Sequence, residues 1–145
     1  MRSKRFRPIV KHAQRLEQNA ARALGEAQRR VSEAQQRLDQ LCDYRCEYTR
    51  RFSESGNQGL GVDRLMDYQA FLDKLNIAIA QQQQHIAKAE QALQQCRDHW
   101  FAQRGRSKLL DNVLERYVES EMQQASKKEQ REIDDRGTRP SWPEE

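Results

Sequence analysis

The sequence predicts an all-α fold: a long antiparallel two-helix coiled-coil hairpin with a longer second helix and a disordered C-terminal tail. Ala, Gln, Arg, Glu and Leu dominate the 145 residues, of which 33% are charged, and this composition is typical of long helices. Apolar residues recur at alternating spacings of three and four in two long stretches, which a Gly- and Ser-rich segment separates. We expect one domain over 1–136, with helices at about 8–52 and 64–134, a loop at about 53–63 and a tail at 137–145.

The first predicted helix has a regular apolar stripe. Pro8 suits a first helical turn because its missing N–H is not needed there. Eleven of the thirteen heptad positions between Val10 and Phe52 are apolar, and only Glu17 and Arg45 are not. We call these positions the first seam: Val10, Ala13, Glu17, Ala20, Leu24, Ala27, Val31, Ala34, Leu38, Leu41, Arg45, Tyr48 and Phe52.

The second predicted helix follows the segment SESGNQGLGVD, whose Gly, Ser and Asn residues are typical of loops. Asp63 is a plausible N-cap, and Gly105 weakens the helix by about 1 kcal/mol relative to Ala. Thirteen of its seventeen heptad positions are apolar. This second seam comprises Leu65, Tyr68, Leu72, Leu75, Ile79, Gln82, Ile86, Ala89, Leu93, Cys96, Trp100, Gln103, Ser107, Leu110, Leu114, Tyr117 and Glu121.

Folding the chain back at the loop predicts which residues face each other. With Phe52 opposite Asp63, Val10 lies opposite Gly105. Beyond about residue 106 the second helix then has no partner within the chain, apart from whatever the first nine residues cover. An apolar stripe on an unpaired helix usually binds another molecule. The expected unpaired stripe comprises Leu110, Val113, Leu114 and Tyr117.

The same register brings Tyr44 and Phe71 together on one edge of the hairpin, beside the seam residues Leu41, Tyr48 and Leu75. The opposite edge is mostly polar. These two aromatic residues either thicken the core near the loop or form an interface hot spot.

The sequence carries few features of a catalytic site. It has no Gly-rich phosphate loop, nucleophile elbow or paired carboxylates, so we expect no enzymatic activity, cofactor or small-molecule substrate. Cys42, Cys46, Cys96 and His99 are suitable zinc ligands, but the register separates Cys96 from Cys42 by roughly 35 Å. We therefore expect no metal site.

The expected location is cytoplasmic. No apolar run approaches a membrane span or a secretory signal, and the odd number of cysteines indicates a reducing compartment. The basic N-terminus either contacts an acidic partner or is simply solvated. Its cations are Arg2, Lys4, Arg5, Arg7, Lys11 and Arg15.

The residues around the loop resemble the FliJ family of bacterial flagellar type III export proteins. The resemblance is carried by Leu41, Asp43, Tyr44, Glu47 and Tyr48 before the loop, and by Tyr68, Gln69, Phe71 and Leu75 after it. It implies a stalk-like coupling protein and chaperone that binds the export ATPase hexamer, the membrane export gate and flagellar substrate chaperones. It also implies a peripheral position at the cytoplasmic face of the inner membrane at the flagellar base.

The resemblance also implies two binding surfaces. Six gate-facing residues match the family, while Arg37 replaces a family Gln and Gln82 replaces a family His. The unpaired stripe of Leu110, Val113, Leu114 and Tyr117 is expected to face the ATPase. The gate-facing surface is Arg37, Leu41, Tyr44, Tyr48, Phe71, Leu75, Ala78 and Gln82.

Three alternatives stay open at this point. A stalk protein of a virulence type III secretion system has the same layout. A basic coiled coil that binds nucleic acid would use the N-terminal arm, although no known nucleic-acid motif is present and we expect no nucleic-acid partner. A structural coiled coil would form homo-oligomers, whereas the predicted hairpin is monomeric when isolated.

Overall fold

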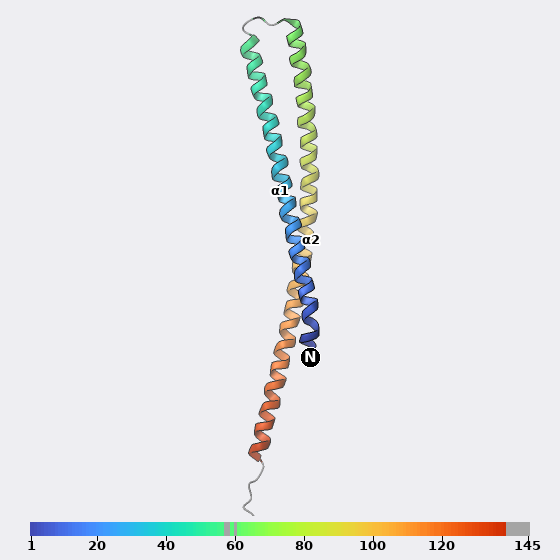
Figure 1. Cartoon of the computed structure of the whole chain (residues 1–145), viewed down its shortest axis with the longest axis vertical. Coiled ribbons are helices and arrows are strands. Elements are labelled where there is room, and N and C mark those ends of the chain that lie inside the picture. The colour runs from blue at the N-terminus through green and yellow to red at the C-terminus, as the bar shows by residue number, and fades with distance from the viewer. Residues whose placement is uncertain (57–58, 60, 139–145) are drawn as a thin grey trace, which may run out of the picture. The chain divides into compact units, whose positions relative to one another are not determined.

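The computed structural model describes residues 1–56, 59 and 61–138, and over these residues the chain consists of two helices (Figure 1). Helix α1 spans Arg2–Gly56 and helix α2 spans Val62–Thr138. The predicted all-α fold is therefore confirmed, as is the longer second helix, at 77 residues against 55. Of the predicted tail, 137–138 belong to α2 and 139–145 lie outside the described residues.

Both helices extend beyond their predicted bounds. α1 begins at Arg2, about two turns before the predicted start, and includes Pro8 within the helix. The added turns form because Ser3 is buried and Phe6 is half-buried against α2, so tertiary packing outweighs the local preference of proline for a first turn. At the other end, α1 runs on to Gly56. Gly59 then adopts a φ of 74°, a left-handed conformation that glycine tolerates without steric cost.

The contacts group the chain into two units. The loop-end unit is Ala20–Trp100, and the terminal unit combines Met1–Asn19 with the chain from Phe101 onward. Within each unit a segment of α1 lies antiparallel to a segment of α2, as the colours of Figure 1 show. No described stretch of either helix is both long and apolar enough to span a bilayer.

The two predicted seams form the core. Every residue of the first seam is buried or half-buried, and so is every residue of the second seam except Leu65, which is 43% exposed. The buried part of α1 consists largely of alanines at every seventh position, whereas α2 buries larger aliphatic side chains. Short alanine side chains let the two backbones approach closely, and the larger side chains of α2 fill the remaining space.

The predicted register holds where Tyr44 meets Phe71, but other pairings are shifted. Phe52 stacks on Tyr68 rather than lying opposite Asp63. In the terminal unit the shift is larger, because Phe6 contacts Tyr117, about two helical turns beyond its expected partner. Both of these shifted pairings lie toward the C-terminal end of α2, and α1 itself continues for a further turn to Gly56.

Candidate partner-binding site

Five aromatic rings gather near the loop in the loop-end unit. Tyr44, Tyr48 and Phe52 follow each other at intervals of four on α1, so they share one face of that helix. Tyr68 and Phe71 approach them from α2. The ring centroids are 3.7 Å apart between Phe52 and Tyr68, and 4.5 Å apart between Tyr48 and Phe71. We call these five residues the aromatic cluster.

The edge predicted at Tyr44 and Phe71 is confirmed. Their rings meet edge to face, with centroids 5.9 Å apart and an interplanar angle of 72°. Tyr44 remains 52% exposed, and Phe71 is half-buried. A ring that is held in place by its neighbours and still faces solvent can bind a partner at low entropic cost.

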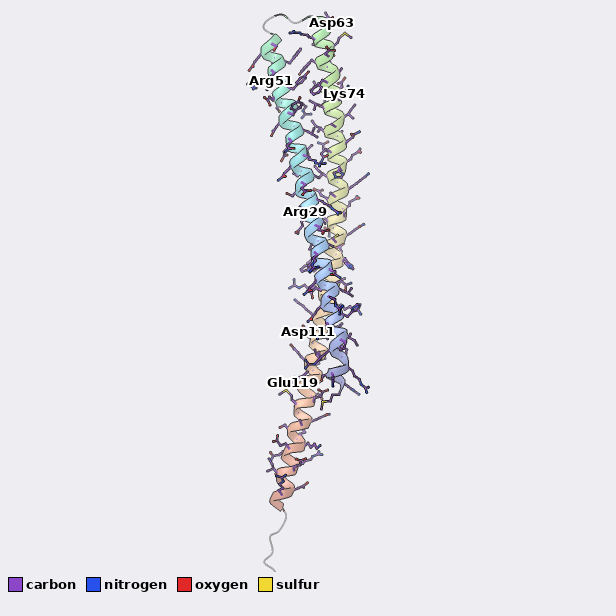
Figure 2. All side chains as sticks on the ribbon, in the orientation of Figure 1. Arg29, Arg51, Asp63, Lys74, Asp111 and Glu119 are labelled. Carbon is purple, nitrogen blue, oxygen red and sulfur yellow. The ribbon has the colours of Figure 1, made fainter. Side chains whose placement is uncertain are left out.

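A groove opens beside the aromatic cluster. It has a volume of about 370 Å³, within the range typical of ligand pockets, and two of its lining residues are cationic. Figure 2 labels one of these, Arg51, on the last turns of α1. Arginine beside aromatic rings is a common composition for protein-binding surfaces. The lining consists of Tyr44, Tyr48, Arg51, Phe52, Ser55, Arg64, Asp67 and Tyr68.

The other expected gate-facing residues differ in how much surface they offer. Arg37 is exposed, Leu41 and Ala78 are half-buried, and Leu75 is only 7% exposed. Leu75 therefore supports the edge from inside the core. The Gln82 amide donates a hydrogen bond to the Ala34 carbonyl across the seam at 2.9 Å, which turns it inward.

Sequence reasoning assigned Phe52 and Tyr68 to the seam and missed their part in the site. They form the closest ring stack among the described residues and line the groove. A signal was present in the composition, because five of the eight Tyr and Phe residues lie between Tyr44 and Phe71. Two of these five residues, Tyr44 and Phe71, lie outside the seams, so the seams alone do not account for the clustering.

The stripe of the terminal unit, which was expected to be covered by the first nine residues at most, is partly covered. Tyr117 meets the Phe6 ring edge to face, with centroids 5.4 Å apart. Val10 and Ala13 are only 3% and 2% exposed, so α1 also packs over this part of α2. The four stripe residues, Leu110, Val113, Leu114 and Tyr117, are all half-buried. Their contact with an ATPase stays a prediction, and the side chains of α2 from 122 to 137 are all exposed.

Two hydrogen bonds between Ser3 and Glu121, which we call the clasp, join α1 to α2 in the terminal unit. The backbone N–H of Ser3 donates to Glu121 Oε1 at 3.1 Å, and the Ser3 hydroxyl donates to Oε2 at 2.6 Å. Glu121 thereby caps the N-terminus of α1 from another helix, where a negative charge also meets the positive end of the helix dipole. The bonds from the Ser3 hydroxyl and then from its N–H hold the pKa of Glu121 below its ordinary value.

The side chains considered above as zinc ligands are those of Cys42, Cys46, Cys96 and His99. All three cysteines are free, with Cys46 exposed and Cys42 and Cys96 half-buried. Among residues 1–56, 59 and 61–138, no three or more His, Cys, Asp or Glu side chains converge to hold a metal ion.

Fold and site together define the class: an antiparallel two-helix coiled-coil protein with an aromatic edge open to solvent. Comparison with known proteins gives the family. Residues 2–142 match the family model described as Flagellar FliJ protein, and the chain belongs to this family.

Two relatives and one solved structure show how far the similarity extends. The Flagellar FliJ protein of Escherichia coli strain K12 is 26% identical over 123 residues, which cover 85% of this chain and 84% of that protein. The Flagellar FliJ protein of Salmonella typhi is 24% identical over 117 residues, covering 81% and 80%. A structure from Chlamydia trachomatis described as a YscO homologue has a TM-score of 0.53 at 15% identity, covering 93% and 88% of the two chains. That structure supports the shared fold alone.

Proposed function

We propose that the chain is a non-catalytic component of the flagellar type III protein export apparatus, acting in flagellum biogenesis and motility. In this proposal it works as a stalk-like coupling protein between the export ATPase hexamer and the membrane export gate. It also receives the chaperones that deliver flagellar substrates. Its place is cytoplasmic, bound peripherally at the inner membrane beneath the flagellum. Membership of the FliJ family over residues 2–142 supports the assignment to flagellar export.

The observation that carries the proposed gate contact is the Tyr44–Phe71 edge. Two helices of a hairpin need only their seams to stay together, and Tyr44 lies outside the seam. Its ring is nevertheless positioned against Phe71 at 5.9 Å and remains 52% exposed. An ordered aromatic ring next to a groove is the composition expected at the centre of a protein interface.

The proposed ATPase contact involves α2 in the terminal unit. Leu110, Val113, Leu114 and Tyr117 are half-buried, so each still offers part of its surface to an ATPase. The exposed stretch from 122 to 137 continues on the same helix and adds to this surface.

Replacing the aromatic edge tests the gate contact. Tyr44→Ala should weaken binding to the cytoplasmic part of the gate protein by about 5- to 150-fold, which corresponds to about 1–3 kcal/mol. Thermal stability should change little because half of the Tyr44 side chain already faces solvent. Phe71→Ala should weaken binding similarly but also lower the melting temperature, since Phe71 touches Tyr48 with ring centroids 4.5 Å apart. Titration calorimetry and thermal melts measure both effects.

Ile77→Ala is the matched control, because Ile77 is 59% exposed on α2 and lies outside the aromatic cluster. It should leave the gate affinity unchanged. The double variant Tyr44→Ala/Phe71→Ala should still bind the export ATPase. Unchanged gate affinity in all folded variants, with only a lower melting temperature, would show that the edge is part of the core and not a binding surface.

A further inference from the structure

A second groove lies further from the loop, still within the loop-end unit. It has a volume of about 370 Å³ and is bounded by α1 on one side and α2 on the other. Its apolar part consists of three alanines, which we call the alanine floor, and its charged and polar side chains are all exposed. The lining consists of Arg30, Glu33, Ala34, Arg37, His85, Lys88, Ala89 and Ala92.

The charges around this groove are unbalanced. Arg30, Arg37 and Lys88 bring three positive charges to it, and Glu33 is the single carboxylate in the lining. Arg29, which is outside the groove, already holds Glu33 at 3.6 Å. Among the described residues, no ion pair engages Arg30, Arg37 or Lys88. Three cations therefore surround one cavity with little internal compensation, and an anionic partner would relieve their repulsion.

We propose that this groove binds an acidic amphipathic helix of a partner protein. Arg30 and Arg37 are seven residues apart, so they lie on one face of α1, two turns or roughly 10 Å apart. A partner helix with carboxylates at positions i, i+4 and i+7 matches this spacing. Small or apolar side chains beside those carboxylates would lie on the alanine floor, as in other complexes where a helix binds in a groove.

The alanine floor favours a protein over a nucleic acid. Phosphate groups gain nothing from contact with Ala34, Ala89 or Ala92, whereas the apolar side of a helix does. Proteins that bind single-stranded nucleic acid place aromatic rings among their cations, and this groove is lined by none.

The inference does not depend on the proposed gate contact. Arg37 belongs to both surfaces, but Arg30, His85 and Lys88 lie outside the expected gate-facing set. Arg30 is also fourteen residues from Tyr44, which on a helix corresponds to roughly 21 Å. A partner can therefore occupy the basic groove without covering the Tyr44–Phe71 edge.

A designed peptide tests the proposal on the full chain. The probe is a fluorescent alanine- and leucine-based helix of about 20 residues with glutamates at i, i+4 and i+7 on one face. A second peptide has the same composition with its glutamates spread around the helix. The patterned peptide should bind saturably and more tightly than the second, measured by fluorescence anisotropy. Binding should weaken as salt rises from about 50 mM to about 300 mM, because screening shortens the range of the charges.

Charge reversal locates the binding site. Arg30→Glu and Lys88→Glu should each weaken the patterned peptide about tenfold, because each replaces attraction by repulsion. Lys74→Glu is the matched control for Lys88→Glu, because it makes the same change on α2, where Figure 2 labels Lys74. Lys74 is exposed and does not line the groove. It should bind almost as the unmodified chain does. All three substituted positions are exposed, so circular dichroism should show unchanged helix content.

Three results would overturn the proposal. Equal binding of the two peptides would show a non-specific charge effect. Tighter binding of duplex DNA than of the patterned peptide, lost in Arg30→Glu and Lys88→Glu, would assign the groove to nucleic acid. Loss of gate binding in these two variants would show that the groove and the gate-facing surface are one binding site. In contrast, loss of gate binding in Tyr44→Ala alone would leave the proposed function and the separate groove both standing.

Discussion

The loop-end unit and the terminal unit share one sequence pattern but bury different side chains. The loop-end unit buries Leu75, Ile79 and Ile86 to between 6% and 8% exposure. In the terminal unit, every side chain buried to this extent is small or polar among the described residues: Ser3, Val10, Ala13 and Ser107. Because hydrophobic stabilisation follows the apolar area removed from water, the loop-end unit should be the more stable of the two. The terminal unit should open first.

The two units also differ in how their outer ends are closed. Aromatic rings close the loop-end unit near its turn, and Tyr44 remains half exposed there. A serine and a carboxylate close the terminal unit, where Ser3 bonds Glu121 twice. Ring contacts do not depend on pH in the physiological range, whereas a carboxylate clasp weakens in acid. The contacts at the aromatic end are therefore independent of pH, while the other end is held by a contact that acid weakens.

Core truncations give the largest expected effects and compare the two units directly. Ile79→Ala should lower the free energy of unfolding by about 2–4 kcal/mol, because it leaves a cavity among large side chains. Val10→Ala should cost only about 1–2 kcal/mol, since it removes two carbons at about 0.8 kcal/mol each. Ile77→Ala, at a position that is 59% exposed, should change stability by less than about 0.5 kcal/mol. Urea unfolding followed by circular dichroism measures all three.

A larger cost for Val10→Ala than for Ile79→Ala would reverse the comparison. Amide hydrogen exchange provides a second measurement on the unmodified chain. Exchange should be slower between Leu75 and Ile86 than between Arg2 and Ala13, because the latter amides open with the terminal unit.

Two glutamines in the second seam sharpen the comparison. Gln82, in the loop-end unit, donates to the Ala34 carbonyl at 2.9 Å. Gln103, in the terminal unit, has a buried Oε1 without a hydrogen-bond partner among the described residues. An unsatisfied buried acceptor costs about 1–3 kcal/mol. Gln103→Leu should therefore raise the free energy of unfolding by about 1–2 kcal/mol, and Gln82→Leu should raise it by less.

Thermal and urea unfolding of the two leucine variants decide this point. The substitutions are chemically identical and both lie in the seam, so any difference reflects the hydrogen bond that only Gln82 makes. Equal stabilisation by the two variants would mean that the bond to Ala34 contributes nothing.

The seams could be predicted from the sequence because heptad spacing is a local property of each helix. All thirteen positions of the first seam, including Glu17 and Arg45, are at least half-buried. The Arg45 guanidinium reaches across to the Asn76 side chain at 3.0 Å, which explains how a cation is tolerated there. The start of α1 could not be predicted in the same way, because its first turns depend on packing against Tyr117 and Glu121.

The site prediction was more accurate in the loop-end unit than in the terminal unit. Tyr44 and Phe71 meet in the predicted register, and the bond between Gln82 and Ala34 is within one residue of it. The stripe ending at Tyr117 is far from the turn, where the error reached about two turns and hid the partner residue Phe6. Which residues pair depends on where the two helices end at the loop. The glycines and serines of this segment indicate a loop but do not show at which residue each helix ends.

The smallest expected effect concerns the clasp and its dependence on pH. Because the two bonds from Ser3 lower the pKa of Glu121 in the folded state, the folded chain favours the ionised carboxylate. This contribution to stability is present above the ordinary glutamate pKa of about 4.3, and it is lost as the pH falls through the lowered value. The unmodified chain should therefore melt at a higher temperature than Glu121→Gln at pH 7. The difference should shrink as the pH falls below about 4.

Comparing variants at each pH separates the effect of the clasp from that of the other carboxylates, which are present in both proteins. Glu119→Gln is the matched control, because Glu119 is exposed on α2 two residues before Glu121, on nearly the opposite side of the helix, and takes no part in the clasp (Figure 2). Ser3→Ala should reproduce the behaviour of Glu121→Gln, since it removes the hydroxyl that makes the 2.6 Å bond. In the double variant Ser3→Ala/Glu121→Gln the second change should add little, because both substitutions break the same contact.

A difference between the unmodified chain and Glu121→Gln that stays constant from pH 7 to pH 3 would mean that the carboxylate charge plays no part. The terminal unit would then be closed by the Phe6–Tyr117 contact and the small buried side chains alone.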